Sequence, residues 1–284
     1  MIIAQERPAL TAGRVIRAVV IALIAIAWLV PTVGLLVTSF RPQSDIAASG
    51  WWRVVEVPRF TDANYARVLT AQHFFTNFVN SFIITIPATI LPIIIGALAA
   101  YAFSWMNFRG RNVIFLTIVA LLVLPLQETW IPVLRMQSAL KMTGTYLSIW
   151  LAHTAYGLPF AIFLLRNFFS ELPKSLFEAA HMDGYSDFGV FWKIVLPLSV
   201  PALASLGIFQ FVWVWNDLMN ALVLLQDLHK FPLTVAIQNL LGSYGSEWNL
   251  LASGAFISMS IPLLVFFILQ RYFVQGLTAG AVKG

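Results

Sequence analysis

The sequence predicts an all-α integral membrane protein with six transmembrane helices. Hydrophobic residues make up 60% of the 284 residues and charged residues only 10%, whereas a soluble domain carries roughly 25% charged residues. A chain with so few charges cannot cover a folded core with polar surface in water. Long apolar stretches alternate with short polar connections. We therefore expect the lipid bilayer to surround one transmembrane domain over residues 1–284.

Six segments have the roughly 20 mostly apolar residues that a spanning helix needs. They are 18–40, 81–105, 113–134, 146–165, 201–223 and 250–270. The first is too long for a signal-peptide core and no A-x-A cleavage pattern closes it, so we expect it to remain in the protein. Four prolines within the spans predict kinks, because neighbouring helices can satisfy the freed carbonyls. These are Pro31, Pro87, Pro92 and Pro125.

An even number of spans places both termini on the same side of the membrane. Arginine and lysine are slightly more frequent in the connections on that side, most clearly in the tight turn with Arg109 and Arg111. The positive-inside bias therefore predicts cytoplasmic termini and a cytoplasmic tail at 271–284. The net charge of +5 is small and scattered. Basic residues beside spans explain it, and nucleic acid is not an expected partner.

Two outer segments are long enough to contact another molecule. Residues 41–80 contain Trp51, Trp52 and Tyr65, and residues 224–250 contain a glycine-rich turn. Its residues Gly242, Tyr244 and Gly245 are candidates for facing a receptor or a solute. The alternative interpretation is that the tryptophans only anchor the chain at the membrane interface.

The inner connection at 166–200 has the pattern of two short helices with an elbow between them. Pro173 begins the first helical stretch, Gly184 breaks it, and Pro197 ends the second. We expect small apolar side chains, Ala179 and Ala180, to be exposed beside Glu178 and Asp183. Such a face would allow a partner to approach closely and would offer it hydrogen-bond acceptors.

The same connection carries a motif with the spacing E-A-A-x-x-x-G-x(9)-I-x-L-P. Its members are Glu178, Ala179, Ala180, Gly184, Ile194, Leu196 and Pro197. The motif resembles the EAA signature of binding-protein-dependent ABC importer permeases. The resemblance implies the type I ABC importer permease fold in a bacterial cytoplasmic (inner) membrane. It also implies that these residues, with Asp183, form coupling helices that contact an ATPase.

The resemblance further implies the partners of the chain. They are a second homologous permease subunit, an ATPase subunit dimer that binds ATP and Mg, and an extracytoplasmic solute-binding protein. The chain itself has no G-x-x-x-x-G-K-[ST] phosphate loop, so we expect no enzymatic activity and no cofactor in it. The four histidines (His73, His153, His181 and His229) lie in different segments, and no metal site is expected.

After about residue 75 the chain is similar to the carbohydrate branch of this family, which includes the second maltose-permease subunit. Residues 239–248 are most similar to permeases for α-glucosides and glucosylglycerol. The ending at 270–284 is similar to that of the branch, which implies that Gln275, Gly276 and Lys283 contact the ATPase. In the maltose branch, a loop at the position of 224–250 reaches into the binding protein.

Ionisable residues inside a membrane usually face a cavity or a partner. Glu128 in the third span and Asp217 in the fifth could lie at similar depth and line a polar, aromatic cavity that suits a sugar. The candidate path residues are Gln127, Glu128, Trp130, Gln210, Trp213, Trp215, Asn216, Asp217 and Asn220. Alternatively, both acids lie at the outer interface and bond to nearby backbone. The resemblance adds that the sugar is held mainly by the other permease subunit of the maltose importer.

The expected cargo is a neutral sugar or glycoside of the α-glucoside, maltose/trehalose or glucosylglycerol type. A glycerophosphodiester or glycerol-3-phosphate importer is the alternative, but a phosphate would require more basic residues near the candidate cavity. Two other classes would also use buried carboxylates: a membrane-embedded hydrolase and a proton-coupled carrier. Neither class explains a complete EAA pattern, and the sequence leaves open whether one or two types of ATPase are used.

Overall fold

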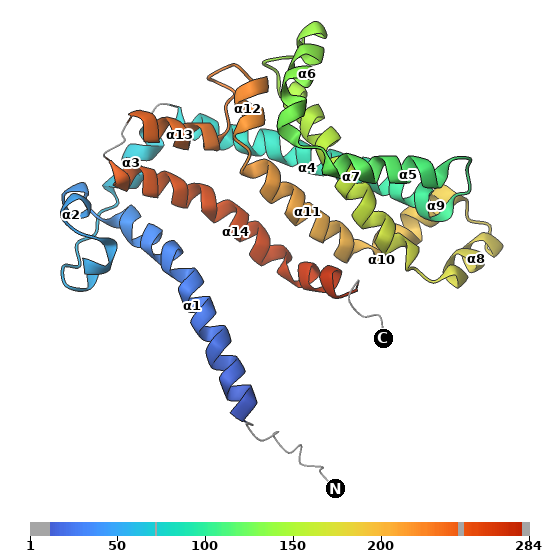
Figure 1. The fold of residues 1–284 in the computed structure, drawn as a ribbon, viewed down its shortest axis with the longest axis horizontal. Helices are drawn as coiled ribbons and strands as arrows, with labels where there is room; N and C mark the ends of the chain where they lie inside the picture. The colour runs from blue at the N-terminus through green and yellow to red at the C-terminus, as the bar shows by residue number, and fades with distance from the viewer. Residues whose placement is uncertain (1–11, 72, 244–246, 280–284) are drawn as a thin grey trace. The chain divides into compact units, whose positions relative to one another are not determined.

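The computed structural model describes residues 12–71, 73–243 and 247–279, and of residues 243 and 273–279 only the backbone. Every regular element in this part of the chain is a helix (Figure 1). The elements are α1 (Ala12–Phe40), α2 (Gln43–Ala48), η1 (Trp51–Val55), α3 (Ala63–Thr70), α4 (Phe74–Trp105), α5 (Arg111–Ala120), η2 (Leu121–Val123), α6 (Leu126–Ala139), α7 (Tyr146–Ser170), α8 (Lys174–Met182), α9 (Asp187–Val190), η3 (Phe191–Val195), α10 (Leu196–Leu198), α11 (Val200–Trp215), α12 (Met219–Leu224), α13 (Leu233–Ser243) and α14 (Trp248–Ala279). The all-α prediction is confirmed.

Four helices of the described residues are long and apolar enough to cross a membrane without interruption: α1, α4, α7 and the Trp248–Tyr272 part of α14. The third predicted span, 113–134, is broken, because α5 and η2 meet α6 at a bend of 105°. A second bend, of 74°, lies between the α9–α10 segment and α11, just before the fifth predicted span begins at residue 201. The number of spans is therefore four, or up to six if each bent pair is one span.

Proline chemistry explains the sharper break. Leu124 has an extended backbone with ψ 126°, and Pro125 precedes the first turn of α6. A proline disfavours the helical conformation of the residue before it, and it cannot donate the next helical hydrogen bond. Pro31, Pro87 and Pro92, by contrast, lie within continuous helices. The fifth predicted span also ends early, because α11 stops at Trp215 and α12 begins only at Met219.

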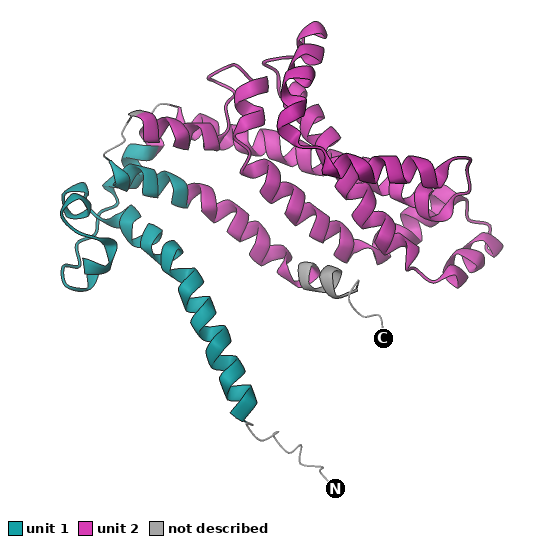
Figure 2. Ribbon diagram, viewed as in Figure 1, with its two compact units in different colours: residues 1–68, 243–256 teal, residues 69–242, 257–284 magenta. Residues whose placement is uncertain are grey.

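The chain forms two compact units, coloured separately in Figure 2. Unit 1 comprises residues 1–68 and 243–256, and unit 2 comprises residues 69–242 and 257–284. Each is described here by itself.

In unit 1 the outer segment after α1 is organised around a buried arginine. Arg41 is only 1% exposed, and its guanidinium donates to the carbonyl of Gly50 at 2.8 Å and to Ser49 Oγ at 3.0 Å. Asn64 Nδ2 donates to the carbonyls of Ser39 and Arg41, both at 2.9 Å. Buried polar groups that are bonded in this way hold a loop in one conformation.

The tryptophans of this outer segment differ in their surroundings. Trp51 packs so closely on α1 that a Cβ atom added to Gly34 would lie 2.7 Å from its Nε1 atom. Trp52 is 65% exposed. Trp51 therefore closes the segment onto α1, and Trp52 is the tryptophan that remains available for an external contact.

Helices α4, α7 and α11 form the centre of unit 2, with α4 packed along both of the others. Gly96 of α4 faces Ala161 of α7, and a Cβ atom at Gly96 would lie 2.8 Å from the Ala161 Cβ atom. Small residues allow helices in a membrane to approach closely. The end of this bundle where α4 begins is held by Asn80, whose amide donates to the carbonyls of His229 and Phe231 and accepts from the Tyr146 hydroxyl.

Candidate functional site: the coupling segment

The connection at 166–200 folds as predicted into two helical parts with an elbow between them. The first part, α8, follows Pro173 and ends at Met182, and the second runs through α9, η3 and α10. Gly184 in the elbow has φ +83°, and an added Cβ atom would meet no atom within 4 Å. The left-handed backbone, and not lack of space, therefore favours glycine there. Ser186 then caps α9, because its Oγ atom accepts from the Gly189 amide at 3.3 Å. We call residues 174–198 the coupling segment.

The expected exposed alanine face is only half correct. Ala179 is exposed, but Ala180 is 4% exposed and belongs to the buried hydrophobic cluster. Positions 177 and 180 lie on one face of a helix because they are three residues apart. Phe177 is large and buried, so the face of α8 that it shares with Ala180 is the face packed into the core.

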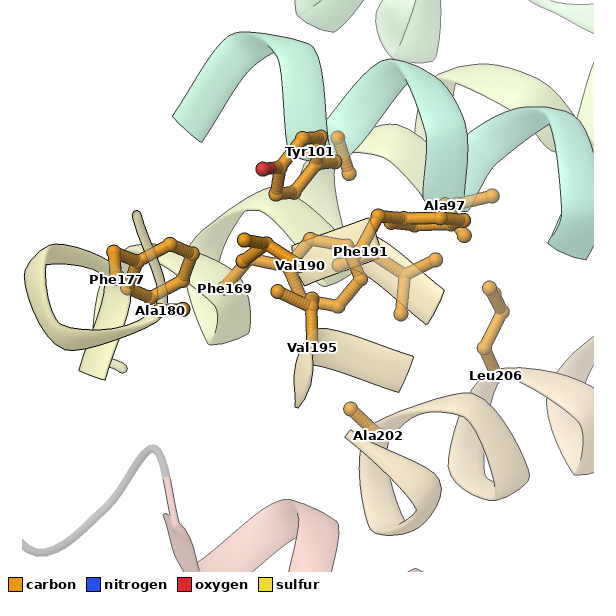
Figure 3. Packing of buried hydrophobic residues seen from close by; sticks show 13 residues of the cluster. Ala97, Tyr101, Phe169, Phe177, Ala180, Val190, Phe191, Val195, Ala202 and Leu206 are labelled. Carbon is orange, nitrogen blue, oxygen red and sulfur yellow. The ribbon is translucent and has the colours of Figure 1, made fainter. Parts of the chain in front are cut away.

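Figure 3 shows this cluster, in which Phe177 and Ala180 of α8 lie near Phe169 of α7 and near Val190 and Phe191. The ring of Phe177 also stacks on Trp105, the last residue of α4, with centroids 3.5 Å apart and 18° between the planes. Trp105 Nε1 donates to the Phe169 carbonyl at 3.0 Å. The coupling segment is therefore packed firmly against the ends of α4 and α7. Sequence reasoning missed Trp105, although a tryptophan at the end of a span indicates a residue at the membrane interface.

The side of the coupling segment that faces away from the buried cluster exposes large apolar side chains on both helical parts. Met182 is 88% exposed, Phe188 66% and Trp192 53%. Asp183 is exposed, and Glu178 is exposed and pairs with Lys174 at 3.2 Å. Such a surface ion pair contributes only about 0.3–0.5 kcal/mol, so Glu178 can exchange this partner for another. Exposed apolar side chains that gather on one surface mark a site of contact with another protein or with the membrane.

A hollow of about 460 Å³ lies beside α8 and is bounded by Trp105, Lys174, Phe177, Glu178, His181 and Met182. It places the motif glutamate and the stacked aromatic pair on one concave surface. The remaining motif residues follow in the second part. Ile194 and Leu196 are half-buried, Pro197 is exposed, and Phe191–Val195 adopt a single π-helical stretch, a feature often found at functional sites.

An ion pair between His181 of α8 and Asp187 of α9 bridges the elbow. His181 Nδ1 lies 2.7 Å from the Phe177 carbonyl, and its Nε2 atom lies 3.1 Å from Asp187 Oδ1. Neutral histidine has one N–H group and cannot donate to both acceptors, so this geometry favours the protonated ring. The Phe177 carbonyl and the Asp187 carboxylate accordingly raise the pKa of His181 above its ordinary value. Sequence reasoning had placed His181 only among scattered histidines.

The raised pKa predicts a pH dependence of the elbow. A group whose folded pKa is raised stabilises the fold fully below its ordinary pKa, and this contribution is lost as pH rises through the folded value. We therefore expect the backbone amides of 183–187 to exchange hydrogen with less protection at pH about 8 than at pH about 6, after correction for intrinsic exchange. Hydrogen-exchange mass spectrometry measures this. The Asp187→Asn variant should lose most of the difference, and an unchanged difference in that variant would contradict the assignment.

The candidate substrate-path residues lie in several different places. Gln127 and Glu128 are exposed in the first turn of α6, and Trp130 is half-buried one turn on. Trp215 is 1% exposed, packs on Phe82 and donates to the Ser258 carbonyl, so it is a core residue and not a cavity wall.

Asp217 and its neighbours lie at the break after α11. Asp217 Oδ1 accepts from Asn220 Nδ2 at 2.9 Å, and its Oδ2 atom accepts from the Ala221 amide at 3.2 Å, so the carboxylate caps α12. Asn216 is exposed and Asn220 is buried. Of the candidates, Gln210 and Trp213 line a cavity in unit 2.

Some predicted contacts lie outside the described residues. Tyr244, Gly245 and Lys283 are not described, and of Gln275 and Gly276 only the helical backbone in α14 is described. Gly242 is exposed near the end of α13.

Similarity to known proteins extends over the coupling segment and most of the chain. The family model described as "Binding-protein-dependent transport system inner membrane component" matches residues 92–279. The osmoprotective compounds uptake permease protein GgtD of Synechocystis sp. is 52% identical over 265 residues, which are 92% of this chain and 89% of that protein. The alpha-glucoside transport system permease protein AglG of Rhizobium meliloti is 52% identical over 233 residues, which are 80% of this chain and 61% of that protein.

A solved structure has a similar fold. It is a chain of a bacterial ABC transporter involved in the import of the acidic polysaccharide alginate. The match has a TM-score of 0.78 at 25% identity and covers 94% of this chain and 100% of that one.

Proposed function

The chain belongs to the family of binding-protein-dependent transport system inner membrane components, and we propose that it carries a neutral α-glucoside or glucosylglycerol inward, driven by ATP hydrolysis in a partner. It is the permease subunit of an ABC sugar importer. The class of solute, and the contacts through which ATP hydrolysis in the partner would move the spans, are proposed below.

The coupling segment is the observation that carries the proposal. It exposes Met182, Phe188 and Trp192 to a partner, and its other side is packed against the ends of α4 and α7. An ATPase dimer that binds ATP and Mg would contact the exposed side and displace the segment as one body. The stack of Phe177 on Trp105 would then pass that displacement to α4. Packed contacts of this kind shift between discrete arrangements and do not deform gradually.

The break between η2 and α6 supports a second permease subunit as a partner. Leu121, Leu122, Val123 and Leu124 are all exposed at this break. Non-helical backbone at membrane depth is tolerated only where protein buries it or where it lines a water-filled cavity. A homologous subunit against this face would bury it. An extracytoplasmic binding protein would deliver the solute from the other side of the membrane, where the 224–250 segment and Trp52 are candidates for contact with it.

The solute class follows from the relatives and from the cavity. GgtD takes up osmoprotective compounds and AglG transports alpha-glucosides, as their names state. The cavity that contains Gln210 and Trp213 has no charged residue in its lining. A phosphate group would need cationic or multiple N–H donors there, which disfavours a glycerophosphodiester. The proposed orientation has both termini in the cytoplasm, where the tail residues Gln275, Gly276 and Lys283 could reach the ATPase.

Reconstitution of the complete importer in proteoliposomes tests this function. We expect the binding protein to be stabilised in a thermal-shift screen by maltose, trehalose or glucosylglycerol, and the radiolabelled form of that solute to accumulate only with ATP. The chain alone should hydrolyse no ATP. Uptake driven by a proton gradient without ATP would contradict the proposal, and stabilisation only by glycerophosphodiesters would contradict the solute class.

A further inference from the structure

One cavity of unit 2 lies among η2, α7 and α11 and has a volume of about 330 Å³, within the range of small-molecule sites. Its wall contains four aromatic rings, and the remaining lining residues are Leu122, Gly157 and Gln210. The rings belong to Tyr156, Phe160, Phe209 and Trp213. Phe160 and Phe209 meet edge to face, with centroids 6.0 Å apart and 87° between the planes.

The polar group of this cavity is an amide held in a fixed place. Gln210 is 4% exposed, and its Nε2 atom donates to the Ala88 carbonyl at 3.1 Å. That is the one hydrogen bond its side chain makes within the described residues. A glutamine amide has two N–H donors and an acceptor oxygen. One N–H donor and the oxygen are therefore left for a ligand.

Gly157 is what makes room for this amide. A Cβ atom added at Gly157 would lie 2.7 Å from both Nε2 and Oε1 of Gln210. Any larger residue would push the amide away from Ala88 and into the cavity. The glycine thus sets the position of the amide and the free volume in front of it.

The two ends of the cavity wall are connected to the bend between η2 and α6 and to the interruption between α11 and α12. The Tyr156 hydroxyl is hydrogen-bonded to Thr129 of α6 at 2.9 Å. Trp213 packs edge to face with His153 at 5.3 Å, and His153 Nε2 lies 3.6 Å from Asp217 Oδ2. In secondary transporters, substrate sites lie typically beside such discontinuous helices. Movement at either break would therefore change the shape of the cavity.

We propose that this cavity is a subsite in this chain for one pyranose ring of the transported solute. The aromatic rings would cover the apolar C–H faces of the sugar, and Gln210 would bond to its hydroxyls. The inference rests on the proposed importer function. It gives this chain a larger share of the sugar site than the expectation that the partner permease mainly holds the sugar, and it places Glu128 outside the subsite.

The test compares glycine variants in the complete reconstituted importer with its loaded binding protein. Gly157→Ala should lower the amount of solute transported per ATP about tenfold, because the atoms nearest to its added methyl group are those of the Gln210 amide, which it displaces. Gly207→Ala in α11 is the matched control, since its Cβ atom would make only an ordinary contact with Ile93 at 3.7 Å. It should behave as the wild type. If Gly157→Ala transports as much solute per ATP as the wild type, the proposed subsite is refuted.

A second measurement uses the absence of cysteine in the chain. A single Phe160→Cys substitution should be labelled by a small thiol reagent, and the solute delivered by the binding protein should slow that labelling about tenfold. Leu147→Cys on the same helix is the control and should show no protection. Equal labelling of Phe160→Cys with and without solute would contradict the subsite. Failure of ATP-driven uptake in the wild type would instead contradict the importer function itself.

Discussion

Replacing Gly184 by proline together with Glu178 by lysine is expected to abolish ATP-driven uptake. Gly184 has φ +83°, whereas proline locks φ near −65°, so the elbow between α8 and α9 must take another path. The lysine reverses the charge that Glu178 would offer to the ATPase in the proposed complex. We expect uptake in proteoliposomes to fall at least about 100-fold, which corresponds to roughly 2.7 kcal/mol of lost coupling. Full uptake by the double variant would refute the role of the coupling segment.

A matched pair of alanine variants separates backbone strain from coupling. Gly110, in the connection between α4 and α5, has φ +82°, almost the same as Gly184. Alanine at either position should cost about 1–2 kcal/mol of backbone strain. We expect Gly184→Ala to reduce uptake clearly more than Gly110→Ala, because only the former changes the surface that the proposed function assigns to the ATPase. Equal losses would indicate a general loss of stability.

Removing the indole of Trp105 is expected to separate ATP hydrolysis from transport. The indole stacks on Phe177 and donates to the Phe169 carbonyl, so it connects α8 to α4 and α7. Truncation of a packed tryptophan to alanine costs about 3–5 kcal/mol. In Trp105→Ala we expect the ATPase to continue while the solute transported per ATP falls about tenfold or more. The measurement is the ratio of radiolabelled solute to released phosphate.

Two further variants interpret the Trp105 result. Trp105→Phe keeps a ring for the stack and should restore most of the ratio. Trp28→Ala removes an exposed tryptophan of α1 and should leave ATP-coupled uptake close to the wild-type value. If Trp105→Ala keeps the wild-type ratio, displacement of α8 must reach the spans by another contact.

Much of the candidate site could be predicted from the sequence because it depends on local chemistry. The E-A-A-x-x-x-G spacing, Pro173 and Gly184 together predict two short helices with an elbow, and the structure has them. Ala180 was predicted on the wrong face, because helical spacing shows which residues share a face but not which face is covered. Phe177 decides that, and its partner Trp105 lies 72 positions earlier in the chain.

The spans show the same division between features set by local sequence and features set by contacts between distant segments. Low charge and apolar segments of spanning length established from the sequence that this is a helical membrane protein, and the motif established its family. Both are properties of short stretches of chain in contact with lipid or with one partner. Only the tertiary structure decided where spans break, that Trp215 is core while Gln210 and Trp213 line a cavity, and that His181 bridges the elbow to Asp187. These features arise from contacts between segments far apart in sequence, whose energies depend on packing geometry that no local pattern records.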